Sequence, residues 1–215
     1  MKRHFRDKRH SRPGCVKVIR RLCFVLASMM ITSSAFAEGP CVVPGQGYFR
    51  IQVGTGGLFG SFAHNHLIEA QKISGCATID SRDITHSSIK LTFPTANVRV
   101  IDPKESAKDR ARVQKTMESE VLHVAEYPEV TFQSVGIDRG TSPDQLRVRG
   151  NLTIRGQARP VIIELNLKHA ADGTFHAQGA YRFKQSTFGI KPVQLGGGTI
   201  KVKDELETEF EIVLK

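Results

Sequence analysis

Three successive segments alternate apolar and polar residues with a period of two, and this feature constrains the fold more than any other. They lie between Tyr127 and Leu167, and the connectors Asp138-Arg139-Gly140 and Arg155-Gly156-Gln157 are typical of tight turns. Successive side chains of a strand point to opposite faces of a sheet, so the alternation predicts a three-stranded antiparallel meander with one dry face. The residues expected on that face are Val130, Phe132, Ser134, Leu146, Val148, Gly150, Leu152, Ile154, Val161, Ile163, Leu165 and Leu167.

Six further segments carry strand-like patterns. They are Tyr48–Val53, Ile73–Ile79, Ser88–Phe93, Ala96–Val100, Phe175–Phe183 and Ile200–Leu214. About eight strands joined by glycine-containing turns predict a mainly β fold, an antiparallel eight-stranded barrel rather than a sandwich. Closure removes exposed strand edges, and about eight strands leave room for side chains or one small ligand.

One helix is expected between the predicted strand Ala96–Val100 and Tyr127. Asp102 suits the N-cap and Pro103 the first turn. The residues at helical spacing are Ala107, Ala111, Gln114, Met117 and Val121. The other faces carry charges, among them Lys104 and Glu105. We predict a solvated amphipathic helix that lies over the barrel, in preference to a helix that binds a membrane surface.

The first 37 residues have the pattern of a secretory signal peptide. A basic region ends at Arg20-Arg21, a short apolar run follows, and Ala35-Phe36-Ala37 forms an A-x-A site. The run is too short to span a bilayer, which needs about 20 residues. We expect export by general secretion, cleavage after Ala37 and a periplasmic location. The expected domains are the signal peptide at 1–37, an N-terminal segment at 38–47 and the barrel at 48–215.

Removal of the leader changes the charge of the protein. The full chain has a formal net charge of +10, but the leader holds nine of its 31 Lys and Arg and one of its 21 Asp and Glu. The mature chain of 178 residues therefore keeps 22 basic and 20 acidic residues, and its net charge is about +2. A near-neutral domain does not favour nucleic acid as a partner.

Cysteine use agrees with export. Cys15 and Cys23 lie in the leader, so Cys41 and Cys76 are the two cysteines of the mature chain. Two cysteines in an oxidising compartment most simply pair. We expect this disulfide to tether the N-terminal segment; two unpaired thiols are the alternative.

The order of several motifs resembles the YceI-like family of polyisoprenoid-binding, lipocalin-like barrels. The motifs are Tyr-Pro-x-Val-Thr-Phe-x-Ser at 127–134, Gly-Asn-Leu-Thr-Ile-Arg-Gly at 150–156, Arg-Pro-Val at 159–161 and Ser-Thr-Phe-Gly-Ile at 186–190. The resemblance covers roughly Tyr48 to the C-terminus. The chain departs from the family at 114–122, where Arg-Asp-x-His-Leu is usual, at Gln185, where arginine is usual, and at His64, which precedes the better match His66.

The resemblance implies a carrier that holds or shuttles an isoprenoid or quinone-like apolar chain in the barrel. The residues expected at the ligand are Phe62, His66, Phe93, Phe132, Tyr181, Phe183 and Phe188. No cofactor is expected, and the bound molecule that the resemblance implies is a polyisoprenoid or an isoprenoid quinone. Transient membrane contact and a homodimer remain open. Parity alone leaves a second interpretation open, in which the same residues fill a solid core and the barrel binds another protein.

Two further functions are weighed against the carrier. His64 and His66, at i and i+2 on a strand, share a face and could chelate zinc or copper, with His86 or His123 as a third ligand. The chain lacks Gly-x-Ser-x-Gly and His-Glu-x-x-His motifs, and Ser61 beside the two histidines is the one nucleophile near a base. We therefore expect no catalysis, and metal binding stays a weak alternative.

Overall fold

The chain divides into a unit of Met1–Phe36 and a unit of Ala37–Lys215. A computed structural model describes residues 39–56 and 65–215, all within the second unit. The predicted signal peptide and cleavage site, with Phe62 and His64, lie outside the described residues.

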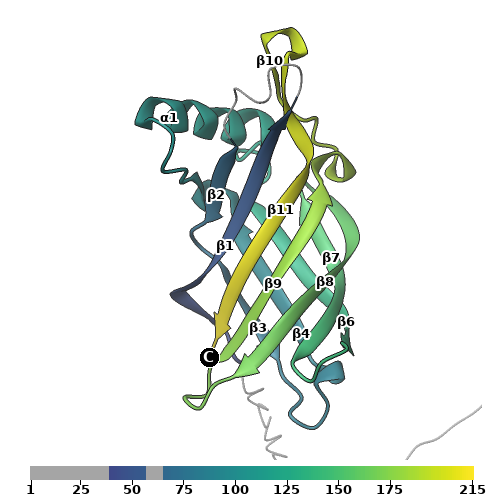
Figure 1. The fold of residues 1–215 in the computed structure, drawn as a ribbon. Helices are drawn as coiled ribbons and strands as arrows, with labels where there is room; N and C mark the ends of the chain where they lie inside the picture. The colour runs from purple at the N-terminus through teal and green to yellow at the C-terminus, as the bar shows by residue number, and fades with distance from the viewer. Residues whose placement is uncertain (1–38, 57–64) are drawn as a thin grey trace, which may run out of the picture. The chain divides into compact units, whose positions relative to one another are not determined.

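The described unit is a curled antiparallel sheet with one α-helix (Figure 1). Its strands are β1 (Val42–Gly56), β2 (His66–Ala70), β3 (Ser74–Thr78), β4 (Ser88–Pro94), β5 (Val98–Val100), β6 (Glu129–Arg139), β7 (Gln145–Ile154), β8 (Gln157–His169), β9 (Phe175–Lys184), β10 (Gln194–Leu195) and β11 (Ile200–Leu214). The helix is α1 (Ala107–Thr116), and the short helical turns are η2 (Ile84–His86), η3 (Thr95–Asn97), η4 (Met117–Val121), η5 (Gln185–Phe188) and η6 (Gly196–Gly198). The mainly β, antiparallel, barrel-like class is confirmed.

The sheet contains eleven strands, more than the eight expected. Ten follow one path, β3-β4-β6-β7-β8-β9-β11-β1-β2-β5, and β10 pairs with β11 beside it. The two-residue strand β10 was not among the predicted strands, and β2 was anticipated only as the strand that carries His66. β1 also begins at Val42, so most of the expected N-terminal segment already belongs to the sheet.

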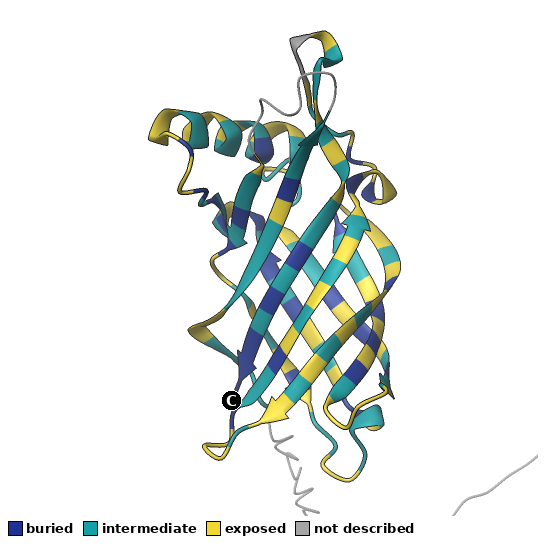
Figure 2. Ribbon diagram, viewed as in Figure 1, coloured by how far each residue is buried: buried dark blue, intermediate teal, exposed yellow. Residues whose placement is uncertain are grey.

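The predicted meander forms the wall β6-β7-β8. Phe132 pairs with Leu152, Ser134 with Gly150, and Val148 with Ile163, all as the parity required. Figure 2 shows buried and exposed residues alternating along these strands. Gly150 has a packing role, because a Cβ there would stand 2.5 Å from the ring of Phe132.

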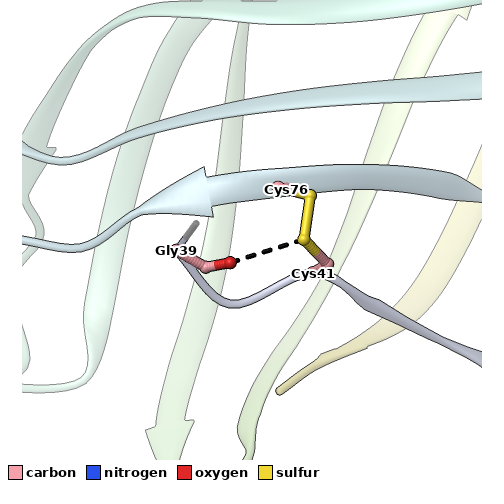
Figure 3. Close-up of a disulfide and its surroundings, with 3 residues drawn as sticks. All are labelled: Gly39, Cys41 and Cys76. Atoms are coloured by element: carbon pink, nitrogen blue, oxygen red, sulfur yellow. Dashed lines mark hydrogen bonds between the residues drawn. A yellow bond between two sulfur atoms is a disulfide. The ribbon is translucent and has the colours of Figure 1, made fainter. Parts of the chain in front are cut away.

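At one end of the barrel, here called the disulfide end, the chain just before β1 meets β3. The isolated antiparallel bridge Cys41–Cys76 joins the start of β1 to β3, and Ala77 N–H donates to Pro40 O over 2.8 Å. A disulfide links Cys41 to Cys76, as the sequence predicts, and Figure 3 shows it beside Gly39. A Cβ on Gly39 would stand 1.8 Å from Ala77 O, so only glycine permits this approach.

The opposite end, here called the helix end, carries α1. The predicted start of the helix at Asp102 is wrong. The N-cap is Ser106, whose Oγ accepts from Asp109 N–H over 3.1 Å and donates to the Asp109 carboxylate over 2.7 Å. This cap gives the Asp109 N–H of the first turn an acceptor, while the Asp102 carboxylate accepts from Lys104 N–H in the turn before it. No helix in the described residues is long and apolar enough to cross a bilayer.

Candidate ligand-binding site

A cavity of about 540 Å³ opens inside the helix end of the barrel. Its wall comes from β1, β2, β4, β5, β6, β7, β9 and β11, and from α1 with η4. Most lining side chains are apolar, such as Ile51, Ile68, Val98, Phe183 and Val202. Several inward positions here hold small or branched residues, so the strands enclose space that their own side chains do not fill.

Three phenylalanine rings pack where this cavity borders a smaller void. Phe49 lines the cavity, Phe93 lines both it and a smaller void of about 70 Å³, and Phe210 lines the smaller void. The ring centroids of Phe49 lie 4.9 Å from Phe93 and 5.8 Å from Phe210. The smaller void is lined by apolar residues alone, and the interior narrows from the helix end towards the rest of the barrel.

The mouth of the cavity is polar and lies under the start of α1. Lys104, Glu105, Ser106, Asp109 and Arg112 all line it. The charges largely balance, and Arg112 Nη2 pairs with Asp109 Oδ1 at 3.1 Å. An elongated molecule with an apolar chain and a polar end therefore matches this interior.

A histidine–glutamate pair lies at the boundary between the apolar wall and the polar mouth. His66 Nδ1 lies 2.5 Å from Glu105 Oε1, and the side chains are 19% and 4% exposed. The pair connects the first residue of β2 to the turn before α1. The expectation that Glu105 lies on a solvated helical face is wrong, because the helix begins one residue after it, at the Ser106 cap.

The predicted ligand residues fall into three groups. His66, Phe93 and Phe183 line the large cavity, and Phe132 lines the smaller void. Tyr181 and Phe188 line neither and pack instead against Phe183, with ring centroids 5.9 and 5.7 Å away.

Tyr181 and Phe188 support the wall in different ways. Phe188 is 1% exposed and packs with Ile154 and Ile190. Burial raises the pKa of the Tyr181 phenol above its ordinary value of 10.0, because desolvation disfavours the charged form. Both residues hold Phe183 in place rather than lining the space beside it.

The alternative metal site has no third ligand in the part of the chain that is described. No three His, Cys, Asp or Glu side chains gather there at metal-binding positions. His66 Nδ1 is already paired with Glu105, His86 with Asp80 at 3.6 Å, and His123 with Glu126 at 3.9 Å. His64 and Ser61 lie outside the described residues, so their roles stay predictions.

Gln185 lines the cavity and is 4% exposed. Its Nε2 donates to Lys203 O over 2.8 Å and so fixes η5 to β11. The sequence singles this residue out as a departure from the family pattern, and the structure gives it a neutral, fully covered position in the wall.

Comparison with known proteins identifies the family to which this chain belongs. Residues 49–214 match the family model described as the YceI-like domain. The chain belongs to the YceI-like family. Protein YceI of Salmonella arizonae is 26% identical over 176 residues, which cover 76% of this chain and 83% of that protein.

Solved structures of the same fold are more distant in sequence. BcnA of Burkholderia cenocepacia superposes with a TM-score of 0.63 at 18% identity, over 81% of this chain and 99% of that one. A polyisoprenoid binding domain from Saccharophagus degradans gives 0.61 at 10% identity, over 83% and 98%. These likenesses show the fold shared by this YceI-like protein.

Proposed function

We propose that this YceI-like protein is an exported carrier that holds the apolar chain of an isoprenoid-type lipid, with isoprenoid quinones among the candidates. The observation that carries the proposal is the cavity of about 540 Å³, whose wall is apolar and whose mouth is polar. Cavities of this size with few polar groups are typical of small-molecule sites. A barrel with a solid core would leave no such space, so the cavity favours a carrier over a purely protein-binding barrel.

Two further observations support the proposal. The Saccharophagus degradans neighbour is described as a polyisoprenoid binding domain, and the same fold in this chain encloses an apolar cavity. The signal-peptide pattern and the Cys41–Cys76 disulfide both agree with an oxidising compartment such as the periplasm. Transient membrane contact would follow, since long isoprenoid lipids reside in bilayers. Homodimerisation stays a prediction.

The test is native mass spectrometry of protein purified gently from the periplasm, before and after extraction with organic solvent. We expect the measured protein mass to be that of a chain that begins at Glu38. A bound molecule that is lost on solvent extraction should fragment as an isoprenoid chain. Retention of the leader would contradict export. An excess that resists solvent but leaves with chelator would contradict the carrier and favour metal binding.

A cavity-filling variant sharpens this test. Ala70 lines the cavity and is 6% exposed, so Ala70→Phe should place a ring in the space that the lipid needs. We expect the lipid load to fall at least ten-fold (roughly 1.4 kcal/mol or more in binding) while circular dichroism is unchanged. Val135→Phe, at a site 64% exposed on the outside of β6, is the matched control. An unchanged lipid load in Ala70→Phe would overturn the location of the site.

A further inference from the structure

The side chain of Glu105 has one oxygen without a hydrogen-bond partner. Its Oε1 faces His66 Nδ1 at 2.5 Å, but Oε2 is fully covered and meets no donor among the described residues. The side chain as a whole is 4% exposed and lines the cavity. Buried polar groups without a partner are rare in proteins and destabilise the folded state. A ligand in the cavity that hydrogen-bonds to this oxygen would remove that cost.

The hydrogen-bonding character of Oε2 does not depend on where the shared proton lies. If His66 Nδ1 carries it, Glu105 is a carboxylate and Oε2 is an acceptor. If Oε1 carries it, Oε2 is the carbonyl oxygen of the acid and is again an acceptor. In both arrangements the group that completes the site must donate a hydrogen bond.

We propose that the carried lipid has a hydroxyl head, as in a long-chain alcohol or a phenol, and that this hydroxyl donates to Glu105 Oε2. The inference rests on the carrier function proposed above and names the chemical class of its ligand. The last torsion of a glutamate is soft, so the carboxylate can rotate towards the cavity that its side chain lines, and the proposal requires this rotation.

The same geometry disfavours a phosphorylated head. A phosphate presents mainly acceptor oxygens, so it would place an acceptor against the acceptor Oε2. Where Glu105 is a carboxylate, it would also place like charges together in a poorly solvated site, where they repel strongly. The cations at the mouth do not reverse this, because Arg112 is paired with Asp109, and the side chain of Arg110 is bound to the backbone oxygens of Asp102 and Glu105. Lys104 lies on the exposed rim.

Three probes with one chain and different heads test the proposal: geranylgeraniol, its methyl ether and its monophosphate. Affinity is measured on delipidated full-length mature protein by displacement of N-phenyl-1-naphthylamine and by native mass spectrometry. We expect the alcohol to bind about ten-fold or more tightly than the ether, because the ether cannot donate and would leave the buried Oε2 without a hydrogen bond. The monophosphate should bind more weakly than the alcohol.

Two variants assign the preference to Glu105. Glu105→Leu removes the acceptor, so the alcohol should lose its advantage while the ether keeps its affinity, which also reports that the barrel is folded. Glu105→Gln removes the charge and should narrow the gap between alcohol and monophosphate. Glu120→Gln and Glu120→Leu are matched controls, since Glu120 lies exposed on η4 and does not line the cavity.

The outcomes separate the two proposals. Equal affinity for alcohol and ether, or tightest binding of the monophosphate, overturns the hydroxyl-head inference and leaves the carrier standing. An alcohol preference that survives Glu105→Leu also overturns it. Failure of all three probes to bind overturns the carrier function together with the inference.

Discussion

At the scale of single residues, Tyr181 shows how an inward strand position changes the chemistry of a side chain. It lies on the inner face of β9, where its ring stacks on Phe183, and its neighbours Ala180 and Arg182 are exposed. Desolvation raises the pKa of its phenol above 10.0. The folded protein therefore holds this proton more tightly than the unfolded chain does, so Tyr181 lowers the stability of the fold as pH rises beyond about 10 towards its folded pKa.

Tyr181→Phe should remove one high-pH transition from the tyrosinate absorbance of the folded protein. The chain has three tyrosines, so the difference between wild type and variant isolates this phenol. We also expect the variant to lose less stability than wild type as pH rises above about 10. Tyr48→Phe is the control and should leave the delayed transition in place. A Tyr181 transition at or below 10 would contradict the desolvation described here.

At the scale of elements, a single glutamine joins α1 to the edge of the sheet. Gln114 Oε1 accepts from Val100 N–H and its Nε2 donates to Val98 O, each over 2.9 Å. The side-chain amide thus pairs with β5 as a neighbouring strand would. Arg99 and Gln114 also converge on Glu118 Oε1, at 3.0 and 2.7 Å. The edge strand β5 is thereby satisfied without a further strand.

Gln114→Ala should destabilise the protein by about 1–3 kcal/mol, because it leaves the largely buried Val100 N–H without its acceptor. Urea unfolding measures the loss, and faster hydrogen exchange at Val100 should locate it. Gln178→Ala, on the exposed face of β9, should stay within about 0.5 kcal/mol of wild type. Equal unfolding midpoints for the two variants would show that other contacts hold the helix.

The elements also show what the sequence can and cannot predict. Strand parity follows from local alternation, so Phe93, Phe132 and Phe183 were correctly placed inside the barrel. The pairing of His66 with Glu105 joins residues 39 positions apart and leaves no periodic signal. Helix patterns near Asp102 assigned Glu105 to solvent, whereas the Ser106 cap leaves it in the preceding turn, facing the cavity. A buried carboxylate of this kind can be recognised only from the three-dimensional structure, because the residues that surround it are far apart in the sequence.

At the scale of the whole described unit, the two ends of the barrel are held by different means. Strand pairing and a covalent bond join β1 to β3 at the disulfide end, while mainly polar side-chain contacts hold α1 at the helix end. The disulfide spans 35 residues of sequence, so it restricts the unfolded chain considerably. The disulfide end should therefore be more stable against local unfolding than the helix end.

Cys41→Ser with Cys76→Ser should lower the free energy of unfolding by about 3–4 kcal/mol in the chain-entropy model. Chemical denaturation of the double variant measures this loss, and reduced wild-type protein is the control that should behave alike. The lipid load per folded molecule should be unchanged, because neither cysteine lines the cavity. A midpoint equal to that of the oxidised wild type would contradict a stabilising bridge.

The packed rings of Phe49, Phe93 and Phe210 lie between the cavity and the smaller void, and would limit how far a lipid chain extends inward from a head held at Glu105. For a lipid whose head is held at the mouth, the distance from the mouth to these rings would then limit the length of chain that can be buried. Every methylene that does not fit below the mouth stays in water and forfeits about 0.8 kcal/mol, and a chain that is too short leaves apolar wall uncovered. If the head is held at Glu105 as proposed, discrimination by chain length would follow from these three rings together with that carboxylate.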